Sequence, residues 1–283
     1  VPHTINWYFF LSSTINFTKI NIKTISHHKV KIFNIIIPFW CYIIGIRNII
    51  HKRKIDNIVN EAKLLAAGGV KELIIISHDF TDYGLDLKRK DPTVKETPVE
   101  LLRELANVEG IKWIRLLYLY PDGITPEMIS LIKSNEKFVK YFDMPLQHIN
   151  NNVLKNMNRK MTREEILRAL SLIRSEIPEA VIRTQFIVGF PGETEENFEE
   201  LLEFIADQKF DRVGCFQYSP EENTPGGKMP DQIDETTKQR RFEAVMEVQQ
   251  NISREKHKAF IGKTLEVVVE GLSDETDLLL QGR

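Results

Sequence analysis

Cysteine is scarce in this chain, whose 283 residues include only Cys41 and Cys215. Two cysteines cannot build the disulfide framework of a small secreted protein, so we expect a reducing, cytoplasmic location. The prolines are scattered and form no low-complexity linker. An excess of basic residues is also absent, since the formal net charge is −2. This balance argues against a polyanion held by bulk electrostatics and leaves room for a local basic patch.

The first fifty residues lack Asp, Glu and Ala altogether, and they contain one glycine, Gly45. Fourteen isoleucines and nine aromatic residues dominate instead, a composition that A/T-rich codons give when selection is absent. Residues 51–283 hold all forty acids and have a net charge of −7, so the two parts do not look like one evolved sequence. We expect residues 1–50 to be an anomalous, corrupted segment and the chain to be a fragment.

A membrane anchor is the alternative interpretation of this first segment. The run Ile32–Ile46 is almost wholly apolar, but a helix needs about 20 such residues to span a bilayer. Asn34, Pro38 and Arg47 interrupt or bound the run. A secretory signal would need a charged start and a small-residue cleavage site, and neither is present. We therefore expect no membrane contact.

From residue 55 onward, β-prone runs alternate with helical patterns. The clear runs, each of a length suited to one buried parallel strand, are Lys71–Ser77, Lys112–Leu119, Lys140–Leu146, Val181–Val188 and Asp211–Tyr218. Lys29–Ile37 is a candidate for a sixth strand at the front. Strands that alternate with helices indicate βαβ units and a parallel sheet. Six such units predict an α/β fold, either a partial barrel or a doubly wound sheet.

Several helix starts are marked by their own residues. Thr97-Pro98-Val99-Glu100 and Thr162-Arg163-Glu164-Glu165 predict capping boxes, in which the threonine accepts a free amide and the glutamate reaches back. Thr125-Pro126 predicts a helix with proline at its first position. One helix is expected to lie on the sheet through apolar residues at i, i+3, i+4 and i+7, namely Phe198, Leu201, Leu202 and Ile205.

Every clear strand ends in polar side chains or glycines. Loops at the carboxyl ends of parallel strands converge, so this edge of the sheet is where a ligand binds. The strand ends are Ser77-His78-Asp79, Tyr120-Pro121-Asp122, Gln147-His148, Gly189–Thr194 and Tyr218–Asn223. We expect His78 and His148 to form hydrogen bonds rather than bind a metal, because they lie on different loops without ligand spacing.

The turn Gly189–Thr194 is the most informative of these strand ends. Gly189 and Gly192 lack a Cβ, so the backbone there can approach a ligand closely. A helix that begins after Thr194 presents free amides and a partial positive charge to an anionic group. Taken alone, this is a generic strand-to-helix turn.

Three segments together resemble a known family, the radical S-adenosylmethionine (SAM) methylthiotransferases. They are Tyr141–His148 (YFDMPLQH), Arg183–Thr194 (RTQFIVGFPGET) and Phe210–Pro225 (FDRVGCFQYSPEENTP). The likeness runs from about Lys52 to the C-terminus and is greatest to the RimO-type branch. That branch adds a methylthio group to the β-carbon of an aspartate in small-subunit ribosomal protein twelve. The MiaB-type branch, which modifies an adenosine in tRNA, is the alternative, and the acidic balance of residues 51–283 suits a basic protein substrate better.

The resemblance implies a fold and a set of domains. Residues 51–258 would form a partial (β/α)6 TIM-like barrel of the radical SAM type, and residues 259–283 the truncated start of a β-rich TRAM module. The family's N-terminal cluster domain is expected to be missing from this chain. The implied partner is a ribosomal protein, with weak RNA or ribosome contact through the TRAM module, and the implied state is a monomer.

The resemblance also implies two cofactors. One is a four-iron four-sulfur (4Fe-4S) cluster held by three cysteine thiolates, and the other is SAM, whose reductive cleavage on that cluster gives a 5′-deoxyadenosyl radical. Catalytic residues stay unassigned. The residues that match positions around SAM are Ser77, Asp79, Gln147, Arg183, Gly189, Gly192, Glu193 and Tyr218. For Arg183, an ion pair inside the barrel is the alternative to cofactor contact.

The family's cluster motif, Cys-x-x-x-Cys-x-x-Cys after the first strand, is incomplete here. Aligning Trp40-Cys41 with its end places Cys41 at the third cysteine and Asn34 and Pro38 at the other two. Neither replaces a thiolate, so this chain is not expected to hold the cluster. We interpret the segment as a cluster loop altered by a frameshift, a sequencing error or gene decay.

Two other functions compete with a radical enzyme. A non-catalytic barrel remnant would need no cluster. A lyase that uses a lysine Schiff base is disfavoured, because no lysine stands out at a strand end. Cys215, which alternates with Val213 and Gln217 in a strand, is expected in the core rather than in any site.

Overall fold

Six parallel strands form the main sheet of the protein. The structure, a computed structural model, describes residues 22–25, 31–34, 53–77, 80–273, 276 and 278–282. In this part of the chain the sheet has the order β2-β3-β4-β5-β6-β7. These strands are β2 (Lys31–Asn34), β3 (Glu72–Ile76), β4 (Trp113–Leu116), β5 (Phe138–Gln147), β6 (Val181–Val188) and β7 (Arg212–Gln217).

The strand order decides between the two expected architectures. Each adjacent pair is parallel, and each strand lies beside its neighbour in sequence. A doubly wound sheet would reverse its order at a switch point, whereas a barrel adds each new strand on the same side. The fold is therefore the predicted partial (β/α)6 TIM-like barrel. The clear strands are confirmed, as is the candidate strand at the front.

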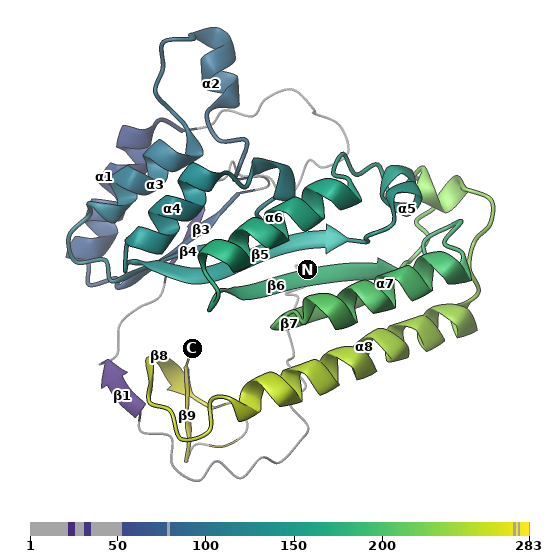
Figure 1. Cartoon of the computed structure of the whole chain (residues 1–283). Helices are drawn as coiled ribbons and strands as arrows, with labels where there is room; N and C mark the ends of the chain where they lie inside the picture. Colours follow the sequence, from purple (N-terminus) through teal and green to yellow (C-terminus); the bar gives the residue numbers. More distant parts are fainter. Residues whose placement is uncertain are drawn as a thin grey trace.

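Helices connect the strands and cover one face of the sheet. Figure 1 shows α1, α3, α4, α6 and α7 over the same face, with α8 alongside α7. The helices are α1 (Ile55–Ala67), α2 (Leu85–Lys90), α3 (Pro98–Ala106), α4 (Pro126–Ser134), α5 (Asn151–Asn156), α6 (Arg163–Glu176), α7 (Glu195–Gln208) and α8 (Glu235–Lys258), with 3-10 turns η1 (Pro121–Gly123) and η2 (Gly226–Lys228).

Threonine caps begin four of these helices, namely α3, α4, α6 and α7. The capping box at Thr162 and Glu165 is complete, as predicted. Thr125 precedes the proline of α4 and accepts from the Met128 amide at 3.2 Å. The capping box predicted at Thr97 is only half formed, so that part of the prediction is wrong. Thr97 accepts from the Glu100 amide at 3.0 Å, but the Glu100 carboxylate pairs with Arg103 on the next turn of α3 instead of reaching back.

Side chains of the strands alternate between two faces. The even-numbered residues of β6 are buried under the helices, where Phe186 packs with ring centroids 6.2 Å from Phe204 and 6.0 Å from Phe210. The apolar face predicted for α7 also packs on this core. Paired residues in parallel strands share a face. We call the opposite face the inner face; its polar residues include Arg115, Tyr141, Asp143, Arg183 and Arg212.

A small second sheet follows α8. Strand β8 (Leu265–Leu272) pairs antiparallel with β9 (Leu280–Gly282) and parallel with β1 (Ile22–Ile25). An ion pair between Lys112 and Glu266 joins it to the barrel. A strand therefore forms where the TRAM module was expected to start, while the domain boundaries themselves stay a prediction. Within the described ranges no helix has the length and apolar character needed to cross a bilayer.

Candidate functional site at the carboxyl ends of the strands

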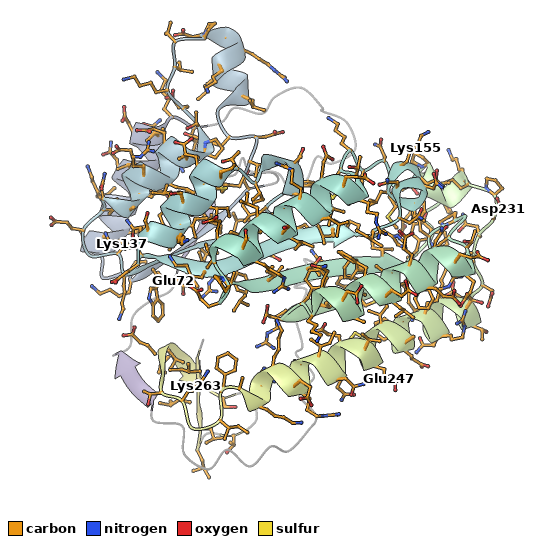
Figure 2. The ribbon with its side chains drawn as sticks, viewed as in Figure 1. Glu72, Lys137, Lys155, Asp231, Glu247 and Lys263 are labelled. Atoms are coloured by element: carbon orange, nitrogen blue, oxygen red, sulfur yellow. The ribbon has the colours of Figure 1, made fainter. Side chains whose placement is uncertain are left out.

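The predicted site residues come to one edge of the sheet. Ser77 follows β3, Gln147 ends β5, Gly189 follows β6 and Tyr218 follows β7. Figure 1 shows the arrowheads of β5 and β6 pointing to this edge. In Figure 2, Lys155 and Asp231 lie near it, whereas Glu72 and Lys137 lie at the opposite edge. His78, Asp79 and Cys41 lie outside the described residues.

Two strand ends adopt unusual backbone conformations. Gln147 has a φ of 70° and Tyr118, two residues after β4, has a φ of 57°. Residues other than glycine rarely occupy this left-handed region, and such outliers cluster at binding and active sites. The outliers therefore support a functional role for this edge, and the assignment of Gln147 to SAM stays a prediction.

A buried carboxylate holds the turn after β6. The side chain of Glu193 is fully buried, and it accepts hydrogen bonds from the Gly189 backbone amide, from Nη1 of Arg241 at 2.8 Å and from His148 at 3.2 Å. The Nδ1 atom of His148 accepts from the Asn150 amide at 3.0 Å, so the ring proton lies on Nε2 and is donated to Glu193. The predicted hydrogen-bonding role of His148 is confirmed.

Helix α8 supplies two residues that the sequence patterns did not single out. Arg241 balances the charge of Glu193, and it also donates to the Glu193 backbone carbonyl at 3.1 Å. Lys238 packs against Gly189, which has a φ of 73°, so that a Cβ there would collide with the lysine side chain. The Lys238 ammonium pairs with Glu235 at 2.7 Å and lies 5.9 Å from the Tyr218 ring centroid. The one sequence signal for Lys238 and Arg241 was their spacing of three residues, which places both on the same face of a polar helix.

These contacts change the interpretation of the glycine turn. The space beside Gly189 is filled by Lys238, and the Gly189 amide is bonded to Glu193, so both serve the packing of α8. Gly192 is exposed, with a φ of 81°, and its amide donates to the Asp231 carbonyl at 3.1 Å. Of the two glycines, Gly192 is thus the one with room for a ligand.

Arg183 forms the ion pair that was the alternative to cofactor contact. Its Nη1 atom lies 2.6 Å from Oδ1 of Asp143, which is buried on the neighbouring strand. Burial raises the pKa of the Asp143 carboxyl, and the Arg183 guanidinium offsets part of that rise. Burial alone would lower the pKa of Arg183, but Asp143 raises it above its usual value. The contact thus joins β5 and β6 on the inner face.

The cysteines present do not fit a 4Fe-4S cluster. Cys215 is buried as predicted, with 7% of its surface exposed, and burial raises the pKa of its thiol to about 12. Cys215 is in register with Phe186 and packs in the core under the helices, away from the strand-end edge. Cys41 is the one other cysteine in the sequence. Among the described residues, no group of three or more His, Cys, Asp or Glu side chains is arranged to hold a metal ion.

The sequence matches a family model over most of the barrel. Residues 39–205 match the Radical SAM superfamily. The chain belongs to the radical SAM superfamily. This radical SAM chain is 72% identical over 244 residues to the ribosomal protein uS12 methylthiotransferase RimO of Bdellovibrio bacteriovorus, covering 86% of this chain and 53% of that protein. It is 50% identical over 231 residues to RimO of Clostridioides difficile, covering 82% of this chain and 51% of that protein.

The radical SAM chain therefore spans about half the length of the curated relatives it matches. A solved structure, the radical SAM enzyme coproporphyrinogen III oxidase (HemN) from Escherichia coli, matches 74% of this chain and 46% of its own. That match has 22% identity and a TM-score of 0.45, so the fold assignment rests on the strand order and the family model.

We predict that Arg241→Met destabilises the protein far more than Arg240→Met. Arg241 is buried against Glu193, and its loss leaves an uncompensated buried charge that costs about 3 kcal/mol. Arg240 is its exposed neighbour and pairs with Glu195 on the surface, so its loss moves the urea midpoint little. Urea unfolding followed by circular dichroism measures both. Equal midpoints for the two variants would contradict the structural role of the buried pair.

Proposed function

We propose that this chain contains the barrel of a radical SAM methylthiotransferase that modifies an aspartate of ribosomal protein uS12. The support is the high identity to proteins of that name across the barrel. The geometry is compatible, since the strand ends meet at one edge around a rigid turn held by Glu193. The enzyme would add a methylthio group at the β-carbon of the aspartate.

We assign SAM to the exposed part of the strand-end edge. Gln147, Gly192 and Tyr218 are partly or fully exposed there, Ser77 is a buried candidate directly after β3, and Asp79 is a further candidate outside the described residues. Glu193 and Gly189 would act indirectly, by holding the turn that carries Gly192. Tyr218 is fixed for this purpose, because its ring packs edge-on against Phe190 with centroids 4.8 Å apart.

The missing thiolates limit the reactions that we assign to this polypeptide. One thiolate at Cys41 is too few for the cluster that the family uses, so we assign substrate and SAM binding to this chain and no radical step. This count of cysteines also favours the second candidate function, a non-catalytic barrel remnant. Both candidate functions include substrate binding, but only the radical enzyme holds a cluster. A binding measurement therefore tests what they share, and an iron measurement separates them.

The substrate class follows from charge. The net charge of −7 over residues 51–283 favours a basic ribosomal protein over tRNA, the substrate of the MiaB-type branch. A cytoplasmic monomer fits such a substrate. Weak RNA or ribosome contact through residues 259–283 is part of the same proposal.

Binding to the two substrate classes tests the proposal. We expect the purified chain to bind uS12 of Bdellovibrio bacteriovorus with at least about tenfold higher affinity than an unfractionated tRNA pool at physiological salt. Fluorescence anisotropy with labelled uS12 or tRNA measures this, and a second basic ribosomal protein serves as control for charge alone. Tighter binding of tRNA would favour the MiaB-type function, and equal binding of both ribosomal proteins would contradict uS12 as the substrate.

Restoring the thiolates tests the account of the cluster loop. We expect Asn34→Cys combined with Pro38→Cys to bring the iron content to about four per chain after anaerobic reconstitution, because a cluster then has its ligands. The unaltered chain and the matched Asn34→Ser, Pro38→Ser variant are expected to hold little iron. A brown product with four irons from the unaltered chain would refute the view that it cannot bind the cluster. Failure of the cysteine variant would refute the alignment of Cys41 with the motif.

A further inference from the structure

Strand β7 is the last strand of the main sheet in the part of the chain that the structure describes. It pairs with β6 along one edge, and no described strand pairs with its other edge. Outside the ladder with β6, the described residues make no backbone hydrogen bond to residues 212–217. A free strand edge presents a row of unpaired N–H and C=O groups, which pair readily with a further strand.

The free edge of β7 lacks the usual protection against such pairing. Proteins block exposed edges with proline, lysine, β-bulges or a covering segment. The sequence of β7, Arg-Val-Gly-Cys-Phe-Gln, carries one charge, at its first residue, and its pairing with β6 is regular. Helix α8 packs on the face under the helices, where Val213 contacts the core that contains Val245. The inner face stays open, with 43% of Phe216 exposed, so the edge is free to bind a partner.

Hydrogen-bonded amides join the end of β7 to the exposed side of α8. Nε2 of Gln217 donates to Gln239 at 2.6 Å, and Nε2 of Gln239 donates to Glu243 at 2.6 Å. An open depression of about 510 Å³ lies over these residues. It is lined by Gln217, Glu235, Thr236, Gln239, Arg240 and Glu243. The depression adjoins the end of β7 and has room for side chains of a bound segment.

The depression carries an excess of negative charge. Glu235 pairs with Lys238 at 2.7 Å, and Arg240 pairs with Glu195 at 2.7 Å, so each of these charges is offset. Glu243 is exposed and makes no ion pair with a described residue. A lysine or arginine of a partner would complement this carboxylate.

A strand added to β7 would meet two different surfaces. Its side chains alternate between the faces of the sheet, so every second one lies on the inner face beside Phe216. The Phe216 ring is 3.5 Å from where a Cβ of Gly214 would be, and the two residues form an apolar strip. The other side chains lie toward α8, beside Gln217 and Glu243. The edge therefore suits a segment in which apolar residues alternate with basic ones.

The edge of β7 leads to the proposed SAM site. Tyr218 follows the last residue of β7, and its amide donates to the Val188 carbonyl at 2.9 Å, next to the turn that begins at Gly189. The six residues of β7 span about 20 Å when extended. A segment that pairs with β7 therefore reaches the strand-end edge, where its next residues lie near Tyr218.

We propose that the free edge of β7 binds the substrate as an added β-strand, with apolar residues against Phe216 and a basic residue at Glu243. The occupant is the segment of ribosomal protein uS12 next to its target aspartate, so the inference rests on the proposed function. In such complexes the backbone hydrogen bonds give affinity and the alternate side chains give specificity. A basic ribosomal protein supplies the charge that complements Glu243.

Alternate N-methylation of the peptide backbone tests strand addition. The probe is a labelled peptide of about twelve residues around the target aspartate of uS12 from Bdellovibrio bacteriovorus, long enough to cover β7. Two derivatives carry N-methyl groups on every second residue, in opposite phases. We expect one phase to lose at least about tenfold in affinity, because its blocked amides face β7, and the other to stay within about threefold of the unmodified peptide. Fluorescence anisotropy measures all three affinities.

Charge reversal in the depression tests the basic contact. We expect Glu243→Lys to weaken binding of the unmodified peptide by about tenfold, because attraction is replaced by repulsion. The matched control is Glu109→Lys, in the turn before β4, where Glu109 is exposed and makes no ion pair with a described residue. The control should stay within about twofold of the wild-type affinity. Thermal melting checks that both variants keep the fold.

The outcomes separate the inference from the proposed function. Equal affinities of the two N-methylated peptides, or equal effects of Glu243→Lys and Glu109→Lys, would overturn the inference. If the chain is a dimer in analytical ultracentrifugation and Glu243→Lys makes it a monomer, a second copy occupies the edge, which also overturns it. If intact uS12 binds but the peptide does not, the inference is overturned and the uS12 assignment stands. If neither binds, the proposed function fails and takes the inference with it.

Discussion

The buried carboxylate of Glu193 is the interaction on which the strand-end edge depends. It joins three parts of the chain that are distant in sequence: the loop after β5 through His148, the turn after β6 through Gly189, and helix α8 through Arg241. An unpaired carboxylate at this depth would be strongly unfavourable, so all three donors must be in place together. The turn after β6 is therefore held by hydrogen bonds and ion pairs to Glu193 as much as by apolar packing.

The two faces of the sheet differ in composition: one is apolar and the other carries charged residues. The face under the helices holds the aromatic core around Phe186 and gives the barrel its stability. The inner face carries the Arg115–Glu72 and Arg183–Asp143 ion pairs, and the Arg212 side chain makes no ion pair within the described ranges. The polar inner face and the apolar core thus lie on opposite sides of the same strands.

The fold was largely predictable from the sequence, and the site only in part. Strands such as Val181–Val188 are predictable because their side chains alternate between buried and exposed and polar residues follow their ends. Both features are local patterns in the sequence. Lys238 and Arg241 could not be found in this way, because their burial depends on where α8 docks and they lie on a helix with few apolar residues. The Thr97 box failed for a similar reason, since Arg103 competes for the Glu100 carboxylate. Arg183 could be an ion pair or a ligand contact until the register placed it between Asp143 and Arg212.

Hydrogen–deuterium exchange of a Glu193→Gln variant tests the central role of this carboxylate most directly. If Glu193 joins the three segments, exchange will accelerate together in peptides that cover residues 147–150, 189–194 and 235–242, while α1 and α3 keep their wild-type protection. Faster exchange confined to residues 189–194, with the loop after β5 and the start of α8 unchanged, would contradict the account.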